Sequence, residues 1–506
     1  MKTTVHTKPL PFLKILPAVA AGILAANAVA VPIWAAAAGA AAAIAGAALT
    51  GRRPRTASLL TYAAIFLSAA TVTLATRPHA VLPHGERLVM TLGIADTPET
   101  SGRWMRATAR IDRYRRCDRE DTWHRSGEKA VVRIDTAFRI RAGQRLVATG
   151  YASPLGTPEY AWYTRLMQRR GYSQSVWIND RQELILLPDA YRSPHGIASG
   201  MQAAAAERLA RLDLTPAAYG TAAAMSIGYR SSLPDEVRDD YGTTGASHLL
   251  AVSGLHVGIV AMLVNLLLWL LPAFRYGHVV KNAAAITVIW LYTLLTGLSP
   301  SAVRAALMFS GAQLALAASR SGNSANILLA TASVMLLIRP DYLYDISFQL
   351  SFTAVAGIFL FYRPLYDAVR SRFRLANAFW AVFLVGLSAS FATAPLVSYY
   401  FGRIPLIGIV INPLLILTAN ATVLLSILWI LLPLPPLNAL FSTAIEGAAG
   451  LQNAVIDASA DKGWASLPLE LTVAQVLLLY ALMLAGGILL RRRLAARRPP
   501  LLSETL

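Results

Sequence analysis

Long runs of apolar residues recur along the chain, separated by shorter polar segments. A run of about 18 or more apolar residues is long enough to cross a bilayer as a helix. One further apolar run, at 323–338, is shorter than a typical span. We expect membrane-spanning helices near residues 11–30, 31–49, 57–76, 247–271, 279–298, 302–319, 345–362, 379–400, 404–432 and 471–490.

Between about residues 80 and 195 the pattern changes to short segments in which apolar and polar residues alternate. Such alternation is typical of half-buried strands. Several short strands in this length suit a small barrel or a sandwich, and of these we favour an OB-like barrel. The expected strands lie at 87–94, 105–111, 130–134, 145–151 and 175–178.

These patterns divide the chain into five parts. Lysines precede the first apolar run, as in a signal peptide, but the next runs follow almost at once, so we expect an uncleaved helical hairpin. The segment 437–458 fits a span, a half-helix or an interfacial helix, which leaves the parity of the later spans open. The parts are N-terminal transmembrane helices (1–79), the OB-like domain (80–195), a helical connector at the membrane surface (196–246), a larger transmembrane domain (247–490) and a basic cytoplasmic tail (491–506).

The composition fits an integral membrane protein, with 55% hydrophobic residues, 14% charged residues and a mean hydropathy of +0.49. The expected fold class is a polytopic α-helical membrane protein with an inserted small all-β, OB-like extracytoplasmic domain. The net charge is +19. Since Lys and Arg in short loops stay cytoplasmic, the basic clusters at 51–55, 363–374 and 491–498 are placed inside. The helix at 57–76 then runs outward, and the OB-like domain lies outside.

Residues that could support catalysis or bind a metal do not cluster in the sequence. Cys117 is the single cysteine, which excludes an intrachain disulfide and a cysteine-based zinc site. The eight histidines form no HxHxDH or HExxH motif. We therefore expect no enzyme activity, no catalytic residue, no metal site and no cofactor.

The apolar run that begins at His248 opens with several polar residues, in the sequence HLLAVSGLHVG. A polar side chain inside a bilayer is costly unless it faces a packed or watery interior. On a continuous helix, His248 and His256 would share one side about 12 Å apart, too far to bind one metal ion. We expect them to line an aqueous path with Ser253, although bonding to neighbouring carbonyls is the simpler alternative. Gly254 and Gly258 have the GxxxG spacing that permits close helix packing.

Polar residues also interrupt later apolar runs. Ser299 followed by Pro300 predicts a helix N-terminus, which places Arg304 in the first turns of an apolar helix. Arg304 either reaches to the membrane interface or points inward at an anion. The segment 399–413 is rich in glycine and proline and predicts a broken helix, which is tolerated where it is buried or lines a cavity. Gln349 lies in a segment whose polar side chains either bond between helices or line the path. The expected lining residues are His248, Ser253, His256, Arg304 and Gln349.

Aromatic rings and cations interleave in two segments of the OB-like region. Such a surface could follow a nucleic-acid backbone and stack bases. The alternative is a domain with buried aromatic residues and a solvated basic rim. The candidate DNA-binding residues are Tyr114, Arg115, Arg116, Tyr160, Trp162, Tyr163, Arg169 and Arg170.

Five elements together resemble the ComEC competence family. They are HLLAVSGLHVG at 248, SPSAVRAALM at 299, DISFQLSFTA at 345, FGRIPLIGIVINP at 401 and GTPEYAWYTRLMQRRG at 156. The ordered set is specific, whereas a single element would be weak. The resemblance implies an inner-membrane channel, in the bacterial plasma membrane, for uptake of single-stranded DNA in natural transformation. The implied partners are single-stranded DNA, the lipid bilayer and other competence proteins, namely a DNA receptor and a cytoplasmic ATP-driven helicase, and a homo-oligomer is left open.

The chain departs from the family pattern in three places. Many members carry a C-terminal metallo-β-lactamase-like domain, but no HxHxDH motif follows the basic tail here, so nuclease activity is not expected. Cys117 alone cannot form the disulfide that some members have in the OB-like domain. Gly-Thr-Pro at 156–158 replaces the Asn-Pro-Gly of the family. The alternative function is a membrane-anchored extracytoplasmic receptor for nucleic acid or another anionic polymer, and a third is a small-solute transporter.

Overall fold

The computed structural model divides the chain into two compact units. Unit 1 comprises Met1–Arg208, Ile227–Ser231 and Val257–Asp345, and unit 2 comprises Leu209–Ser226, Ser232–His256 and Ile346–Leu506. The structure describes residues 10–50, 53–77, 82–96, 98–101, 104–117, 122–136, 138, 140–155, 161–179, 184–190, 194–270, 276–317, 323–460, 462 and 465–496.

Unit 1 begins with three helices, α1 (Phe12–Ala28), α2 (Ile33–Leu49) and α3 (Pro54–Ala75), and α3 packs against both of the others. Small residues allow the close approach: a Cβ added to Gly22 of α1 would lie 2.2 Å from the carbonyl oxygen of Phe66 in α3. The helices expected at 11–30, 31–49 and 57–76 are therefore present.

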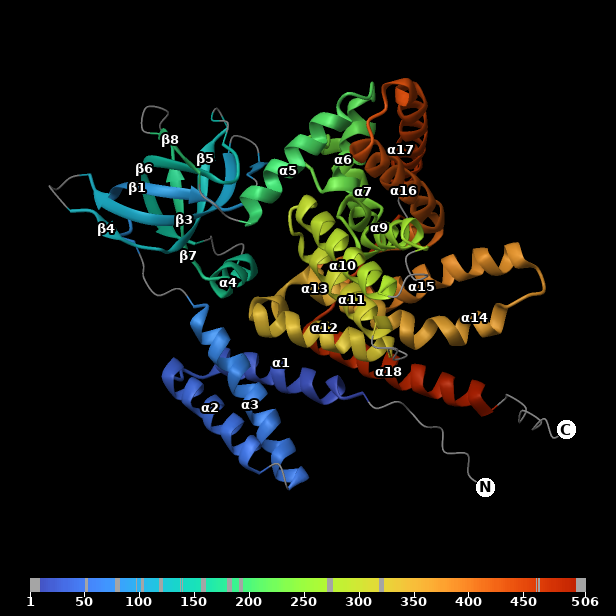
Figure 1. The fold of residues 1–506 in the computed structure, drawn as a ribbon, viewed down its shortest axis with the longest axis horizontal. Helices are drawn as coiled ribbons and strands as arrows, with labels where there is room; N and C mark the ends of the chain where they lie inside the picture. Colours follow the sequence, from blue (N-terminus) through green and yellow to red (C-terminus); the bar gives the residue numbers. More distant parts are fainter. Residues whose placement is uncertain are drawn as a thin grey trace. The chain divides into compact units, whose positions relative to one another are not determined.

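A small closed β-barrel follows α3 (Figure 1). Its strands run in the order β1 (Arg87–Ile94), β3 (Trp104–Arg116), β5 (Lys129–Asp135), β7 (Tyr172–Ile178) and β6 (Gln144–Pro154), and β6 pairs with β1 to close the ring. The β5–β7 pairing is parallel and the others are antiparallel. All five expected strands are present, and the expected small all-β domain is confirmed.

Alternation along the strands produces the core of the barrel. Leu146, Ala148 and Ala152 on β6 point inward and are at most 1% exposed, while Tyr151 between them is 47% exposed. The helix α4 (Ala161–Arg169) lies between β6 and β7 in the chain. The sequence pattern did not predict three flanking strands, β2 (Glu99–Ser101), β4 (His124–Arg125) and β8 (Leu184–Ala190).

Further helices complete unit 1. They are α5 (Pro194–Leu209), most of α9 (Gly254–Leu267), α10 (Gly277–Leu295), α11 (Pro300–Ala317) and α12 (Ser324–Ile338), and the 3₁₀ turn η4 (Pro340–Tyr344) follows α12.

Unit 2 is helical. The helix α16 (Ile407–Leu431) packs on α17 (Asn438–Ala460), and one contact between them is polar: the Thr418 hydroxyl lies 3.3 Å from Oε1 of the fully buried Gln452. Asn453 Oδ1 accepts hydrogen bonds from Thr221 (3.1 Å) and Tyr241 (2.9 Å), which joins α17 to α6 (Pro216–Ile227) and α7 (Asp235–Thr243). The elements are α6 (Pro216–Ile227), α7 (Asp235–Thr243), α8 (Ser247–Leu250), α13 (Ile346–Gly357), the π-helical turn η5 (Ile358–Tyr362), α14 (Arg363–Val369), α15 (Arg374–Phe401), β9 (Arg403–Pro405), α16 (Ile407–Leu431), the 3₁₀ turn η6 (Pro435–Leu437), α17 (Asn438–Ala460), β10 (Ser466–Pro468) and α18 (Val473–Ala496).

Within the described residues, six helices are long and apolar enough to cross a membrane. The segment expected at 437–458 is one continuous helix of 23 residues, α17, and it is not among the six. The expected span at 302–319 corresponds to α11, which is also not among the six. The six are Pro54–Ala75, Gly277–Leu295, Ile346–Val369, Arg374–Phe401, Ile407–Leu431 and Val473–Leu490, and four shorter apolar helices are Phe12–Ala28, Ile33–Leu49, Gly254–Leu267 and Ser324–Ile338.

Candidate functional site

The polar stretch that begins at His248 is not one continuous helix, so the geometry expected for it is wrong. The helix α8 ends at Leu250, and α9 begins at Gly254. The backbone N–H of Ser253 donates to Nδ1 of His256 at 3.3 Å, so the third residue of α9 reaches back to the residue before the helix, as in a capping box. This local bond favours a new helix start over continuation of α8. His248 is exposed, with Nδ1 3.0 Å from the Gly245 carbonyl oxygen.

His256 is fully buried at the start of α9. Since its Nδ1 accepts a hydrogen bond, the neutral ring carries its hydrogen on Nε2. That Nε2 is buried and makes no hydrogen bond within the described part of the chain. Buried donors normally have a partner, so this N–H is an available donor for water or a ligand.

Gly258 lies beside a side chain of α11, and its expected role in close helix packing stays a prediction. A Cβ added to it would lie 3.2 Å from Cζ of Phe309 on α11, so the glycine lets the Phe309 ring approach α9. Gly254 forms the first residue of α9, and its proposed packing role stays a prediction.

Arg304 lies in the interior of unit 1, with only 4% of its surface exposed. The Ser299 hydroxyl accepts from the Ala302 backbone N–H at 3.4 Å, which supports the predicted helix start. The Arg304 guanidinium has the Asp345 carboxylate and the Tyr342 side chain as electrostatic neighbours. Arg304 is therefore buried in unit 1 beside an acidic residue of the chain, and its lining role stays a prediction.

Gln349 bonds between two helices of unit 2. Its Oε1 accepts from the Tyr400 hydroxyl at 2.9 Å, which joins α13 to α15. The packing role weighed for Gln349 is therefore visible, and its lining role stays a prediction.

The broken helix expected at 399–413 is confirmed. The helix α15 ends at Phe401 and is followed by Gly402, whose φ of 65° is left-handed, and β9 then pairs with β10 before α16 begins. A Cβ on Gly245, itself at φ +75°, would lie 2.4 Å from the ring of Pro405, and one on Gly408 would lie 3.2 Å from the Thr244 carbonyl oxygen. Two irregular backbones thus pack directly on each other, and Asn412 Oδ1 is buried there without a hydrogen bond in the described chain.

The candidate DNA-binding residues on β3 have several different neighbours. The Tyr114 ring packs on His124, with centroids 5.4 Å apart, and Arg116 pairs with Glu86 at 2.5 Å. The guanidinium of Arg115 lies 5.5 Å from the centroid of the Trp123 ring. The sequence analysis did not identify Trp123 and His124 as candidates. The available signal was this pair of rings, which follows the Tyr-Arg-Arg segment closely in the sequence.

The remaining candidates lie in or near α4. Tyr160 falls outside the described residues, and Trp162 and Tyr163 belong to α4, although their side chains are not described. The Arg169 guanidinium lies 3.5 Å from the centroid of the Tyr344 ring in η4. Arg169 therefore contacts the turn that follows α12.

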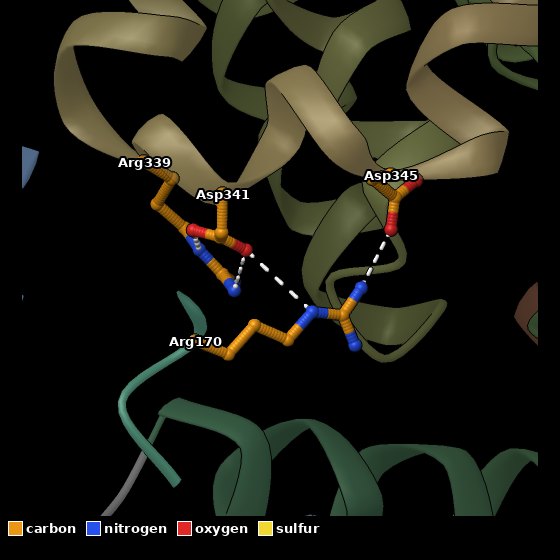
Figure 2. A network of polar contacts seen from close by, with 4 residues as sticks. All are labelled: Arg170, Arg339, Asp341 and Asp345. Carbon is orange, nitrogen blue, oxygen red and sulfur yellow. Dashed lines mark hydrogen bonds and ion pairs between the residues drawn. The ribbon is translucent and has the colours of Figure 1, made fainter. Parts of the chain in front are cut away.

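Arg170 joins the same turn through an ionic network (Figure 2). Its Nη2 lies 2.6 Å from Asp345 Oδ2, and its Nε lies 3.6 Å from Asp341 Oδ2. Arg339 pairs with Asp341 at 2.8 Å. The Asp341 and Asp345 side chains are only 7% and 9% exposed, so both carboxylates need these cations.

Burial and a neighbouring carboxylate act in opposite directions on the pKa of the Arg339 guanidinium. Burial alone would lower the pKa of the Arg339 guanidinium, but the neighbouring Asp341 carboxylate raises that pKa above its ordinary value. The sequence reasoning missed Asp341 and Arg339, although an Arg-Pro-Asp turn after an apolar helix was the available signal.

Apolar helices that can span a bilayer, together with a small inserted barrel, define a multi-pass membrane protein. Residues 225–494, just over half of the chain, match the family described as "Competence protein". The chain belongs to this competence family.

Individual relatives agree with the family match. The chain is 32% identical to ComE operon protein 3 of Bacillus subtilis (strain 168) over 206 residues, which is 40% of this chain and 25% of the relative. It is 28% identical to the competence protein ComA of Neisseria gonorrhoeae over 289 residues, 53% of this chain and 38% of the relative. The matches thus cover less than half of each relative's length. No solved structure matches the chain significantly.

Proposed function

We propose that this protein is the inner-membrane channel through which one DNA strand enters the cytoplasm during natural transformation. Relatives named as competence proteins support a role in DNA uptake. The extracytoplasmic barrel receives the strand, and the helices conduct it. A separate DNA receptor and a cytoplasmic ATP-driven helicase act with it.

The observation that carries the proposal is the packing of two irregular segments in unit 2. The backbone at Thr244 and Gly245 lies against Pro405 and Gly408. The first segment leads into the stretch that ends at His256, and the second contains Asn412. Each of those two residues has a buried polar atom without a hydrogen bond among the described residues. A hydrated path for a polyanion needs such groups, because water and phosphate oxygens must replace bulk hydration.

Transformation by added linear DNA tests the proposal. Deletion of the gene is expected to abolish transformation while surface DNA binding persists. His248→Ala with His256→Ala should reduce transformation strongly at normal protein levels, and His195→Ala, at an exposed histidine, should not. If the double variant transforms at the wild-type frequency, the assignment of both histidines to the lining of the path is wrong.

A second candidate is a membrane-anchored receptor that binds nucleic acid without transporting it. The aromatic and cationic neighbours on β3 favour it, since Trp123 is 40% exposed beside Arg115. Nuclease-protected internal DNA separates the two functions: a receptor leaves DNA outside and accessible to nuclease, whereas a channel delivers it inside.

A further inference from the structure

Five side chains from five adjacent strands form one row across the barrel. Arg106 on β3 lies opposite Arg133 on β5, and Arg133 lies opposite Trp177 on β7. Trp177 lies opposite Tyr151 on β6, which in turn lies opposite Arg87 on β1. Residues directly opposite each other project from the same face of a sheet. The order along the row is therefore cation, cation, aromatic, aromatic, cation.

This row lies on the outside of the barrel. The adjacent row consists of Ala107, Val132, Val176 and Ala152, all buried in the barrel core. Because side chains alternate between the two faces of a strand, the row of Arg133, Trp177 and Tyr151 faces outward. Their burial agrees: Tyr151 is exposed, and Arg133 and Trp177 are half-buried.

Contacts at the centre of the row hold its largest ring in place. The Arg133 guanidinium lies 4.4 Å from the centroid of the Trp177 ring. The Trp104 ring meets Trp177 edge-on at 5.3 Å, and Trp177 Nε1 donates to the Ser153 hydroxyl at 3.1 Å. Trp177 is thus a fixed aromatic surface with a cation over it, and Tyr151 is an accessible ring beside it.

We propose that this row is the surface along which the barrel binds single-stranded nucleic acid. The inference rests on the proposed function and adds the binding residues to it. Guanidinium groups pair with phosphates, and the rings of Trp177 and Tyr151 stack bases, which requires bases that are not hidden in a duplex. With strands about 4.8 Å apart, the row follows the curved barrel for roughly 19 Å, enough for a few nucleotides. The β1–β6 closure brings Arg87 to Tyr151, and the parallel β5–β7 pairing brings Arg133 to Trp177, so strands that are distant in sequence complete the row.

The experiment measures binding of the full-length, detergent-solubilised protein to two labelled 15-mers by fluorescence anisotropy. One is oligothymidine, and the other is an abasic strand with the same number of phosphates. Tyr151→Ala should weaken oligothymidine binding about tenfold and leave abasic binding unchanged, because only base stacking is lost. Tyr151→Phe should restore binding.

The cations have a different signature. Arg106→Gln with Arg133→Gln should weaken binding of both strands and reduce the slope of log affinity against log salt by about 1.4, the value for two lost phosphate contacts. Arg141→Gln is the matched control, since Arg141 is an exposed arginine in the turn before β6 and outside the row.

Two outcomes would overturn the assignment. Wild-type binding and salt dependence in the row variants would place the strand elsewhere on the protein. An equal loss of oligothymidine and abasic binding in Tyr151→Ala would mean that no base stacks there. The two proposals fail in different experiments. Transformation of a strain that lacks the gene would contradict the channel, whereas wild-type DNA binding by the row variants would contradict only the binding row.

Discussion

Arg170 and Asp345 are 175 positions apart in the chain, and Arg170 Nη2 lies 2.6 Å from Asp345 Oδ2. Arg170 follows α4 at the edge of the barrel, and Asp345 immediately precedes α13. The same carboxylate is also an electrostatic neighbour of the buried Arg304. The Asp345 carboxylate therefore interacts with two cations, Arg170 after α4 and Arg304 in α11.

Arg170→Gln is expected to lower the free energy of unfolding by about 1–3 kcal/mol, because two nearly buried carboxylates lose a cationic partner. Asp345→Asn in the same background should recover part of the loss, since a neutral amide needs no counter-charge. Unfolding of the purified single and double variants forms a cycle, with an expected coupling of about 1–2 kcal/mol.

Arg238 provides the control for that cycle. It pairs with Asp235 at 3.3 Å, but the two side chains are 49% and 91% exposed. Arg238→Gln should change the free energy of unfolding by less than about 0.5 kcal/mol, as for an exposed pair. Equal losses in Arg170→Gln and Arg238→Gln would contradict a structural role for the Arg170 network.

Gly245→Ala is expected to destabilise unit 2 by about 2 kcal/mol or more. The residue has a left-handed φ, and its new Cβ would collide with Pro405. Gly386→Ala is the matched control, because Gly386 lies in α15 and a Cβ there would meet nothing within 4 Å. That variant should be neutral or gain up to about 1 kcal/mol from helix propensity. Thermal unfolding followed by size-exclusion chromatography measures both, and similar melting curves would contradict the close packing.

Tyr241→Phe should cost about 1 kcal/mol of stability, because Asn453 Oδ1 loses one of its two hydrogen bonds. The ring is buried and keeps its packing in this variant. Adding Thr221→Ala removes the second donor and should cost more than the sum of the single losses, since the amide oxygen is then left without a partner. A strictly additive result in denaturant unfolding would argue against a shared acceptor.

Cys117 gives a direct test of topology. It is exposed at the end of β3, in the domain placed outside the membrane. A membrane-impermeant maleimide should label it in intact spheroplasts. In a Cys117→Ser background, Thr56→Cys at the start of α3 should be labelled only after permeabilisation, because the adjacent basic cluster is predicted to be cytoplasmic. Labelling of both sites in intact spheroplasts would contradict the predicted orientation.

Local pattern predicted much of this fold. Alternation located the five barrel strands, Ser299 and Pro300 located the start of α11, and the glycines and prolines at 399–413 located the broken helix. These features depend on neighbours in the sequence, which a pattern records.

The remaining features depend on distant or competing contacts. Periodicity favoured one helix through residues 248–256, but the bond between Ser253 and His256 begins a new helix there. The Arg170 network was missed because its acids come from another region of the chain. Arg133 and Trp177 meet through a parallel pairing of β5 with β7, and no local signal reports that pairing.

The short ladder between β9 and β10 has a mechanical consequence for unit 2. It joins the loop between α15 and α16 to the loop between α17 and α18, and Ser398 reinforces it by donating to the Leu469 carbonyl at 2.5 Å. The α15–α16 hairpin and the α17–α18 hairpin are thus hydrogen-bonded to each other at one end. Since the η6 turn joins α16 to α17 at the other end, this central helix pair is held at both ends, and we expect α16 and α17 to move as one body.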